Sequence, residues 1–217
     1  MMIFFNRFFT KKNFSLALLV FCLTSISFAQ SSKPDALALY RNGNYSEAVK
    51  VCEDELAADP NNMESYCVLC WALIANGQYR EAEQMATAAR KVNSRDVRLI
   101  ESLGESKFYL GKNNEALNLF QRYVANASEN ADRLGRVYYL TGEIYIKQAR
   151  YEHADISFST AVRYEPARSY WWTRLGYSKE MASDWQNAVV AYDRALSLDP
   201  SQTDAARGKI RCQSRIN

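Results

Sequence analysis

The chain has 217 residues with a formal net charge of +3; 48% of the residues are hydrophobic and 24% are charged. This length fits one compact domain or one repeat array, and the apolar content is high enough to bury a core, which argues against intrinsic disorder. With only 8 glycines and 4 prolines, the chain has few of the turn residues that a β-sandwich or barrel needs, so an all-α fold is favoured.

The first thirty residues are typical of a secretory signal. A basic stretch that ends at Lys12 precedes an apolar run over residues 14–23, and small residues around Ala29 offer a cleavage site. The run is shorter than the ~20 residues that a membrane-spanning helix needs. We therefore expect a signal peptide over residues 1–29, a short linker over 30–34 and no integral membrane span after cleavage. An uncleaved anchor is the alternative.

Removal of the signal changes the charge balance. Residues 1–29 hold three basic residues and no acidic residue, so the rest of the chain has 24 basic and 24 acidic residues. Nucleic-acid binding depends on cations that neutralise phosphates, and a neutral chain lacks that electrostatic footprint. We expect no nucleic-acid partner, and an exported protein in the periplasm or cell envelope of a bacterium.

A six-residue pattern that ends in alanine recurs along the remaining chain. The copies 43–48, 77–82 and 111–116 follow one another at a spacing of 34 residues. After an insertion of four residues come the copies 149–154 and 183–188, again 34 residues apart. Self-similarity at this period indicates a repeat array, in which no unit buries its apolar stripe alone and neighbours stack.

The first residue of each copy marks the turn between two helices. Gly43, Gly77 and Gly111 stand where the chain must turn, a position where glycine tolerates left-handed backbone at low cost. Ala149 and Ser183 hold the same place in the later copies. We expect those two turns to be of a different or slightly strained kind.

The pattern resembles the tetratricopeptide repeat, a helix–turn–helix unit. Trp172, Leu175 and Gly176 stand where that family has Trp, Leu and Gly in the first helix, and Phe120 and Tyr192 fill its large aromatic position in the second. The resemblance implies an all-α, right-handed superhelical solenoid of about five repeats. The implied bounds are a repeat region 35–200, units of about 35–62, 63–96, 97–134, 135–168 and 169–202, and a C-terminal solvating helix over 203–217.

The cysteines and the histidine offer little chemistry. Cys67 and Cys70 form a CxxC inside a helix, and we interpret both as small core residues. Export leaves a disulfide possible, and Cys52 with Cys70 is the pair that stacked units would bring together. His153 is the one histidine, so it supplies neither a metal cluster nor a catalytic base–nucleophile pair. We expect no enzyme activity, no cofactor and no metal.

In the tetratricopeptide family the first helices line a concave face whose outward residues bind the partner. The resemblance maps that face onto aromatic, acidic and arginine positions, and aromatics and arginine are enriched at binding hot spots. A carboxylate clamp is not expected, since the places where the family has Asn hold Trp71, Glu105, Glu143 and Tyr177. The candidate residues are Trp71, Ile74, Arg98, Glu101, Glu105, Phe108, Tyr109, Arg136, Tyr139, Glu143, Ile146, Tyr170, Tyr177 and Met181.

These features predict an exported scaffold or adaptor that binds a protein or peptide segment. The expected segment has apolar anchors and at least one basic group that faces Glu105 and Glu143. Cell-envelope assembly, secretion or motility machinery is the expected setting. An accessory ligand-binding subunit of an envelope transport system is the alternative.

Overall fold

The computed structural model describes residues 35–216, and this part of the chain forms eleven α-helices, which confirms the all-α prediction. The predicted signal peptide and linker lie outside the described residues. The helices are α2 (Ala36–Arg41), α3 (Tyr45–Ala58), α4 (Met63–Ala75), α5 (Tyr79–Val92), α6 (Val97–Tyr109), α7 (Asn113–Asn126), α8 (Leu134–Lys147), α9 (Tyr151–Tyr164), α10 (Ser169–Met181), α11 (Trp185–Leu198) and α12 (Thr203–Ile216).

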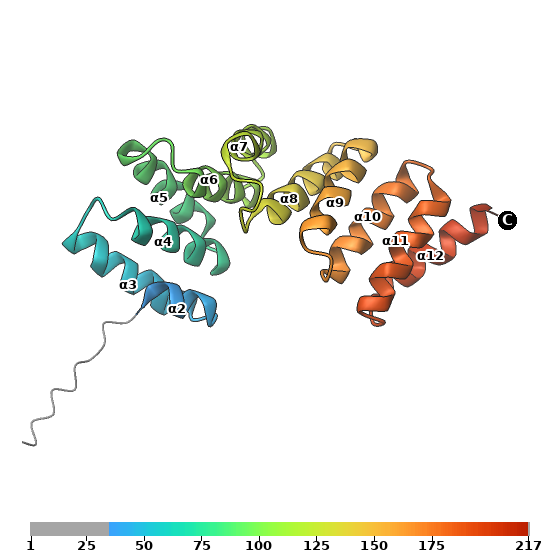
Figure 1. The fold of residues 1–217 in the computed structure, drawn as a ribbon, viewed down its shortest axis with the longest axis horizontal. Coiled ribbons are helices and arrows are strands. Elements are labelled where there is room, and N and C mark those ends of the chain that lie inside the picture. Colours follow the sequence, from blue (N-terminus) through green and yellow to red (C-terminus); the bar gives the residue numbers. More distant parts are fainter. Residues whose placement is uncertain (1–34, 217) are drawn as a thin grey trace, which may run out of the picture. The chain divides into compact units, whose positions relative to one another are not determined.

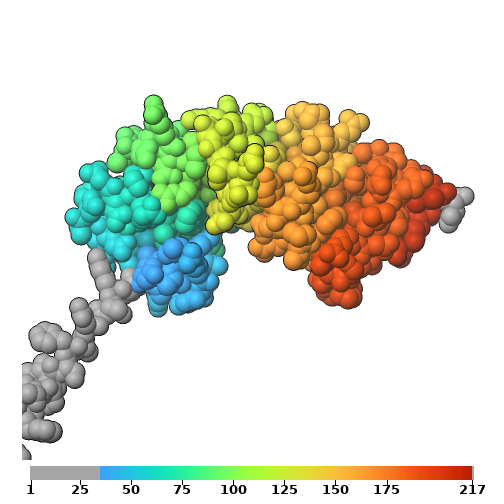
Figure 2. Space-filling view, viewed as in Figure 1, coloured from blue at the N-terminus to red at the C-terminus, as the bar shows by residue number. Residues whose placement is uncertain are grey.

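Consecutive helices form antiparallel pairs, α2 with α3 through α10 with α11, and α12 follows the last pair (Figure 1). We call the even-numbered helix of each pair, and α12, a first helix. Within the described residues, first helices contact the next first helix at α2–α4, α4–α6, α6–α8 and α10–α12, whereas second helices make no comparable contact with one another. The first helices therefore lie on the inner side of the array, and Figure 2 shows each unit against its neighbours.

Each pair is joined by the same tight turn. The residue after the first-helix cap has a positive φ at all five turns: 82° at Gly43, 79° at Gly77, 76° at Gly111, 54° at Ala149 and 64° at Ser183. In the fourth unit the amide of Ala149 donates to the carbonyl of Ile146 and that of Arg150 to Tyr145, and the other four turns repeat this pattern. This is the Schellman motif. The turns at Ala149 and Ser183 are therefore of the same kind as the others, and strained.

Glycines in the first helices make room for an aromatic ring from the second helix. A Cβ built on Gly104 would lie 2.7 Å from the ring of Phe120, and one on Gly142 would lie 2.7 Å from Phe158. In the fifth unit the same test on Gly176 gives 2.6 Å to Tyr192. The close helix contact of these three units thus depends on a residue without a side chain.

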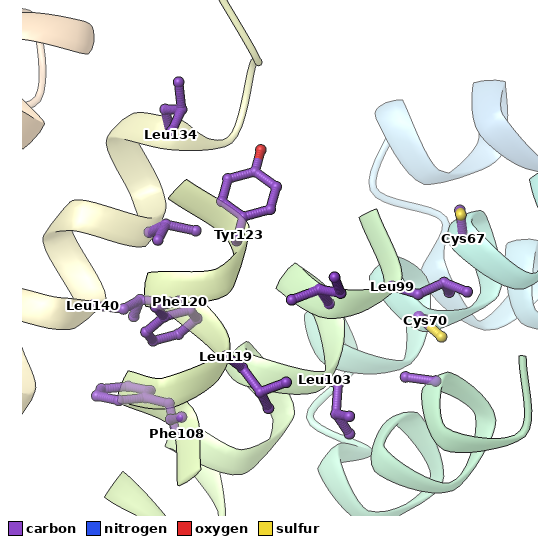
Figure 3. Packing of buried hydrophobic residues seen from close by; sticks show 14 of the residues in the cluster. Cys67, Cys70, Leu99, Leu103, Phe108, Leu119, Phe120, Tyr123, Leu134 and Leu140 are labelled. Atoms are coloured by element: carbon purple, nitrogen blue, oxygen red, sulfur yellow. The ribbon is translucent and has the colours of Figure 1, made fainter. Parts of the chain in front are cut away.

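The second unit fills these positions differently. Its first helix has Cys70 where the later units have glycine, and its second helix has Ala86 where they have an aromatic ring; both are fully buried in one cluster. This cluster runs from Cys67 and Cys70 through Leu99 to Leu140 of the fourth unit, as Figure 3 shows. The apolar core is therefore continuous from the second to the fourth unit.

The four cysteines of the described residues, Cys52, Cys67, Cys70 and Cys212, are free thiols. The structure thus lacks the disulfide between Cys52 and Cys70 that the sequence allowed. Burial raises the pKa of both the Cys52 and the Cys67 thiol to about 12. Buried, protonated thiols of this kind behave as small apolar side chains.

The first and the last described helices, α2 and α12, end the array in different ways. At the start, α2 has only six residues, and the Asp35 carboxylate accepts hydrogen bonds from the amides of Leu37 and Ala38. At the end, α12 buries Ala205, Gly208 and Cys212 and turns its other residues outward. None of these described helices is long and apolar enough to cross a membrane.

Candidate protein-binding surface

The side chains that the first helices turn inward form one surface, which we call the first-helix surface. It contains most of the candidate binding residues. Tyr109, Tyr170 and Met181 are exposed, at 40%, 48% and 41%. Seven further candidates are half-buried: Trp71, Arg98, Arg136, Tyr139, Glu143, Ile146 and Tyr177.

Two apolar candidates belong to the core instead. Ile74 is 6% exposed and packs with the first two units. Phe108 is 9% exposed, and the ammonium of Lys147 from the next unit lies 4.3 Å above its ring. Their assignment to the binding surface was wrong, because the stacking of the neighbouring unit covers both.

The acidic candidates on α6 are also buried, and the basic group that they face belongs to the same chain. Glu101 and Glu105 are both 0% exposed. Arg133 Nη2 lies 2.8 Å from Glu101 Oε1 and 2.7 Å from Glu105 Oε2. Arg136 Nε donates to Glu105 Oε1 at 2.8 Å. In this structure the basic groups that Glu105 faces are therefore Arg133 and Arg136 of the same chain, where the sequence predicted one from the partner.

The two carboxyls differ in their affinity for a proton. Burial raises the pKa of the Glu101 carboxyl to about 7; the positive charge of Arg133 opposes this rise, and the negative charge of Glu105 adds to it. Burial also disfavours ionisation of Glu105. Its hydrogen bonds with Arg136 and the charges of both arginines outweigh burial, so the pKa of Glu105 lies below its ordinary value. Glu105 is the ionised member of the pair near neutral pH.

A ladder of arginine–glutamate pairs joins successive first helices. Arg136 pairs with Glu105, Arg174 with Glu143 and Arg211 with Glu180, and each pair spans 31 residues. In the second of these, Arg174 Nε and Nη2 donate to the two oxygens of Glu143 at 2.5 and 2.9 Å. Glu143 is thus also satisfied within the chain, which corrects the expectation that it awaits a basic group of the partner.

The candidate Arg98 also joins two successive first helices, α4 and α6. Arg98 Nη1 donates to both carboxylate oxygens of Glu64 at 2.8 and 2.7 Å, and Arg98 Nη2 donates to Asp96 Oδ2 at 2.8 Å. The guanidinium therefore holds α4 beside α6, and the Asp96 carboxylate also accepts from the Arg98 amide at the start of α6. The main role of the Arg98 side chain is therefore to hold these two helices together.

Aromatic candidates pair between neighbouring helices. Tyr139 stacks on Trp171 with ring centres 5.0 Å apart and planes at 10°. Tyr79 of α5 stacks on Tyr109 at 4.4 Å, and Arg136 Nη2 donates to the Tyr109 hydroxyl at 3.0 Å. Tyr139 is therefore part of the packing between two units, whereas Tyr109 keeps one face of its ring at the surface.

Two candidates converge on one pocket near the end of the array. Tyr170 and Tyr177 lie two turns apart on α10 and line a pocket of about 200 Å³. The guanidinium carbon of Arg174 lies 5.2 Å from the Tyr177 ring centre. The remaining lining residues are Thr173, Tyr192, Asp204 and Arg211. We call this the tyrosine pocket. Its mixed aromatic and polar lining suits one side chain of a bound segment.

Sequence reasoning missed the arginines that organise this surface, namely Arg133, Arg174 and Arg211. The signal for two of them was present, because Glu143 precedes Arg174, and Glu180 precedes Arg211, by the same 31 residues that separate Glu105 from Arg136. No such spacing marks Arg133, which lies just before α8 in the inserted segment. Among residues 35–216, no group of three His, Cys, Asp or Glu side chains is placed to hold a metal ion.

Family models match two parts of the chain. Residues 135–168 match the model described as tetratricopeptide repeat. Residues 41–123 match the model described as anaphase-promoting complex, cyclosome, subunit 3. The matched segments contain parts of four of the five helix pairs.

Two curated proteins are similar to this chain in sequence at low identity. The human protein O-mannosyl-transferase TMTC1 is 22% identical over 172 residues, which is 79% of this chain. The chain spans about a fifth of the length of the curated relatives that it matches, 20% in this case and 22% in a second.

Solved structures show the same fold. The structure of pilF from Pseudomonas aeruginosa has a TM-score of 0.72 at 15% identity, with 83% of this chain and 81% of that chain covered. YrrB, described as a TPR protein with an unusual peptide-binding site, has a TM-score of 0.61 at 19% identity, with 80% and 88% covered. Together with the match of residues 135–168 to the tetratricopeptide repeat model, the five Schellman-linked helix pairs show the fold of a tetratricopeptide repeat array.

Proposed function

We propose that this protein is an exported scaffold that binds a segment of another protein along its first-helix surface, in the assembly, secretion or motility machinery of a bacterial cell envelope. The observation that carries the proposal is the tyrosine pocket. It brings the exposed ring of Tyr170 and the half-buried ring of Tyr177 together with the polar side chains that line the pocket. Tyrosine and arginine are the residue types over-represented at binding hot spots.

The charge pattern narrows the kind of segment. Because Glu143 and Glu180 already hold Arg174 and Arg211, these two carboxylates do not need a cation from the partner. An exposed ring at Tyr170 and a half-buried one at Tyr177 offer apolar area with a hydroxyl at its edge. A segment with an apolar or aromatic anchor and backbone groups for the hydroxyls fits this surface.

The proposal is tested by capture of partners from a cell-envelope extract of the source organism. The double variant Tyr170→Ala/Tyr177→Ala removes both rings of the pocket, and we expect it to lose most of the captured partner, since truncation of a hot spot costs about 2 kcal/mol or more. Far-ultraviolet circular dichroism checks that the helices remain.

The matched control removes exposed apolar side chains from the other side of the pairs. Ile156 on α9 and Val190 on α11 are 69% and 64% exposed. The double variant Ile156→Ala/Val190→Ala is expected to capture the partner as the wild type does. Equal capture by the tyrosine variant and the wild type would refute a role for the pocket.

The exported location has its own test. When the full chain is expressed in a bacterial host, the protein recovered from the periplasm should begin at Gln30, as read by intact-mass analysis. Recovery of an uncleaved chain from the cytoplasm alone would contradict export. That result would leave the binding surface untouched.

A further inference from the structure

One side chain of the segment between α7 and α8, that of Arg133, lies against the first-helix surface. Arg133 lies at the end of the segment that holds the four-residue insertion, directly before α8. Its guanidinium contacts Glu101 and Glu105 of α6 at 2.8 and 2.7 Å. The guanidinium carbon also lies 5.8 Å from the centre of the Trp71 ring on α4. One cation from the segment before α8 thus contacts groups of α4 and α6.

Trp71, Glu101 and Glu105 together have the chemistry of a receptor for a guanidinium, and we call them the guanidinium site. Two fully buried carboxyls, of which Glu105 is the ionised one near neutral pH, lie in a setting of low dielectric, where a cation is held most strongly. The indole face adds a cation–π contact. A planar fork of N–H donors matches two neighbouring carboxyls better than a compact ammonium does.

With Arg133 in the guanidinium site, two buried N–H groups remain without a hydrogen-bond partner. Arg133 Nε and Trp71 Nε1 are both buried and have no hydrogen-bond partner. The Arg133 side chain makes no capping bond to α8, so its release would leave the start of that helix intact. Glu105 would keep its bonds to Arg136. These features fit an occupant that can be exchanged.

We propose that the guanidinium site is a binding site for an arginine side chain, that Arg133 fills it within the free protein, and that an arginine of the bound segment enters in its place. This inference rests on the proposed function, because it names the chemistry that the same surface selects. The insertion between the third and fourth units then acts as a built-in competitor for the partner.

The test empties the site and offers it a small cation. In Arg133→Ala, removal of one partner of a buried ion pair should lower the Tm by about 10 °C. Methylguanidinium chloride, titrated at a pH of about 8.5 to ionise the carboxyls, should raise that Tm in a saturable manner. Methylammonium chloride and potassium chloride at equal concentration should raise it far less, and the wild-type Tm should not respond to methylguanidinium.

The chain offers a matched control in Arg168. Its guanidinium carbon also lies 5.8 Å from a tryptophan ring, that of Trp171, and it pairs with Glu165. The Arg168 side chain is 63% exposed, however, and no buried pair of carboxyls faces it. We expect Arg168→Ala to show no rescue by methylguanidinium.

A second readout measures entry of an arginine side chain. The peptide acetyl-Ala-Arg-Ala-amide should bind Arg133→Ala at least about 10-fold more tightly than it binds the wild type, because Arg133 occupies the site in the wild type. The same peptide with lysine in place of arginine should bind both proteins equally weakly.

Several results would overturn the inference: no rescue of Arg133→Ala, equal rescue by methylammonium, rescue of Arg168→Ala, or equal affinity of the peptide for both proteins. If Arg133→Ala is unfolded at room temperature, the titration is followed as recovery of the helical circular dichroism signal, and lack of recovery overturns the inference too. These measurements use no partner protein. Their failure is therefore distinct from a failure of the tyrosine-pocket experiment.

Discussion

Single residues with unusual backbone or burial account for much of what distinguishes this chain from a plain repeat array. Ala149 and Ser183 adopt left-handed backbone at 54° and 64° because the Schellman turn requires it, although neither is glycine. The turn geometry is imposed by the helix pair on both sides. The strain is therefore local and can be removed by substitution.

Ala149→Gly should raise the free energy of unfolding by about 0.5–1 kcal/mol, since relief of the left-handed strain exceeds the added chain entropy of glycine. Urea denaturation followed by circular dichroism measures this. The control Ala88→Gly lies in the middle of α5 and should lower the stability by about the same amount. An Ala149→Gly protein less stable than the wild type would show that the left-handed turn carries no strain.

The buried carboxyl of Glu101 makes the stability of the folded protein depend on pH. Its pKa in the folded protein, about 7, lies above the ordinary value of 4.5. The folded state therefore binds this proton more tightly than the unfolded state does, and the stability contributed by Glu101 is present below pH 4.5 and is lost as the pH rises through about 7.

We expect the wild type to be more stable at a pH of about 5.5 than at about 8 by roughly 1–2 kcal/mol, and Glu101→Gln, which cannot ionise, to lose most of this difference. The low pKa of Glu105 works in the opposite direction, but only as the pH falls below 4.5. Urea titrations at both pH values measure the effect. A wild type and a Glu101→Gln protein with the same pH dependence would contradict the assignment.

At the scale of helices, the sequence was informative wherever a contact repeats. The glycine of the first helix, the aromatic ring of the second and the residue at the turn recur at fixed spacing, because each unit meets its neighbours through the same atoms. These positions predicted the helix pairs and the left-handed turns. At the exception in the second unit, both positions hold small residues, Cys70 and Ala86, and both are buried in the same cluster.

The surface residues were harder to predict for a physical reason. Periodicity says which side of a helix a residue occupies, but it does not say whether another segment covers that side. Glu105 and Phe108 lie on the inner side of α6, as expected, yet Arg133, directly before α8, and Lys147, at the end of α8, cover them. The path of the inserted segment decides where Arg133 lies, and no repeat pattern constrains that path.

The tight glycine–aromatic contact gives a prediction for helix pairing. In Gly142→Ala the new Cβ would lie 2.7 Å from the Phe158 ring, so we expect a loss of about 1–3 kcal/mol from overpacking. Phe158→Leu alone should cost about 1 kcal/mol. The double variant should be more stable than the sum of the two losses implies, as urea denaturation of all four proteins would measure. Strict additivity would mean that the ring and the glycine do not limit each other.

For the whole molecule, the arrangement separates two tasks. Within residues 35–216 the core and the arginine–glutamate ladder fix how one unit sits on the next, and the exposed rings near the C-terminal end are left for contact with a partner. The central claim is that the partner lies on the first-helix surface at the tyrosine pocket.

Site-specific photo-crosslinking tests that claim most directly. A benzophenone amino acid is placed at Tyr177, in the tyrosine pocket, or at Val190, on a second helix, and the living cells are irradiated. We expect a covalent adduct with a partner protein from position 177 and none from position 190. An adduct from position 190 with none from position 177 would contradict it.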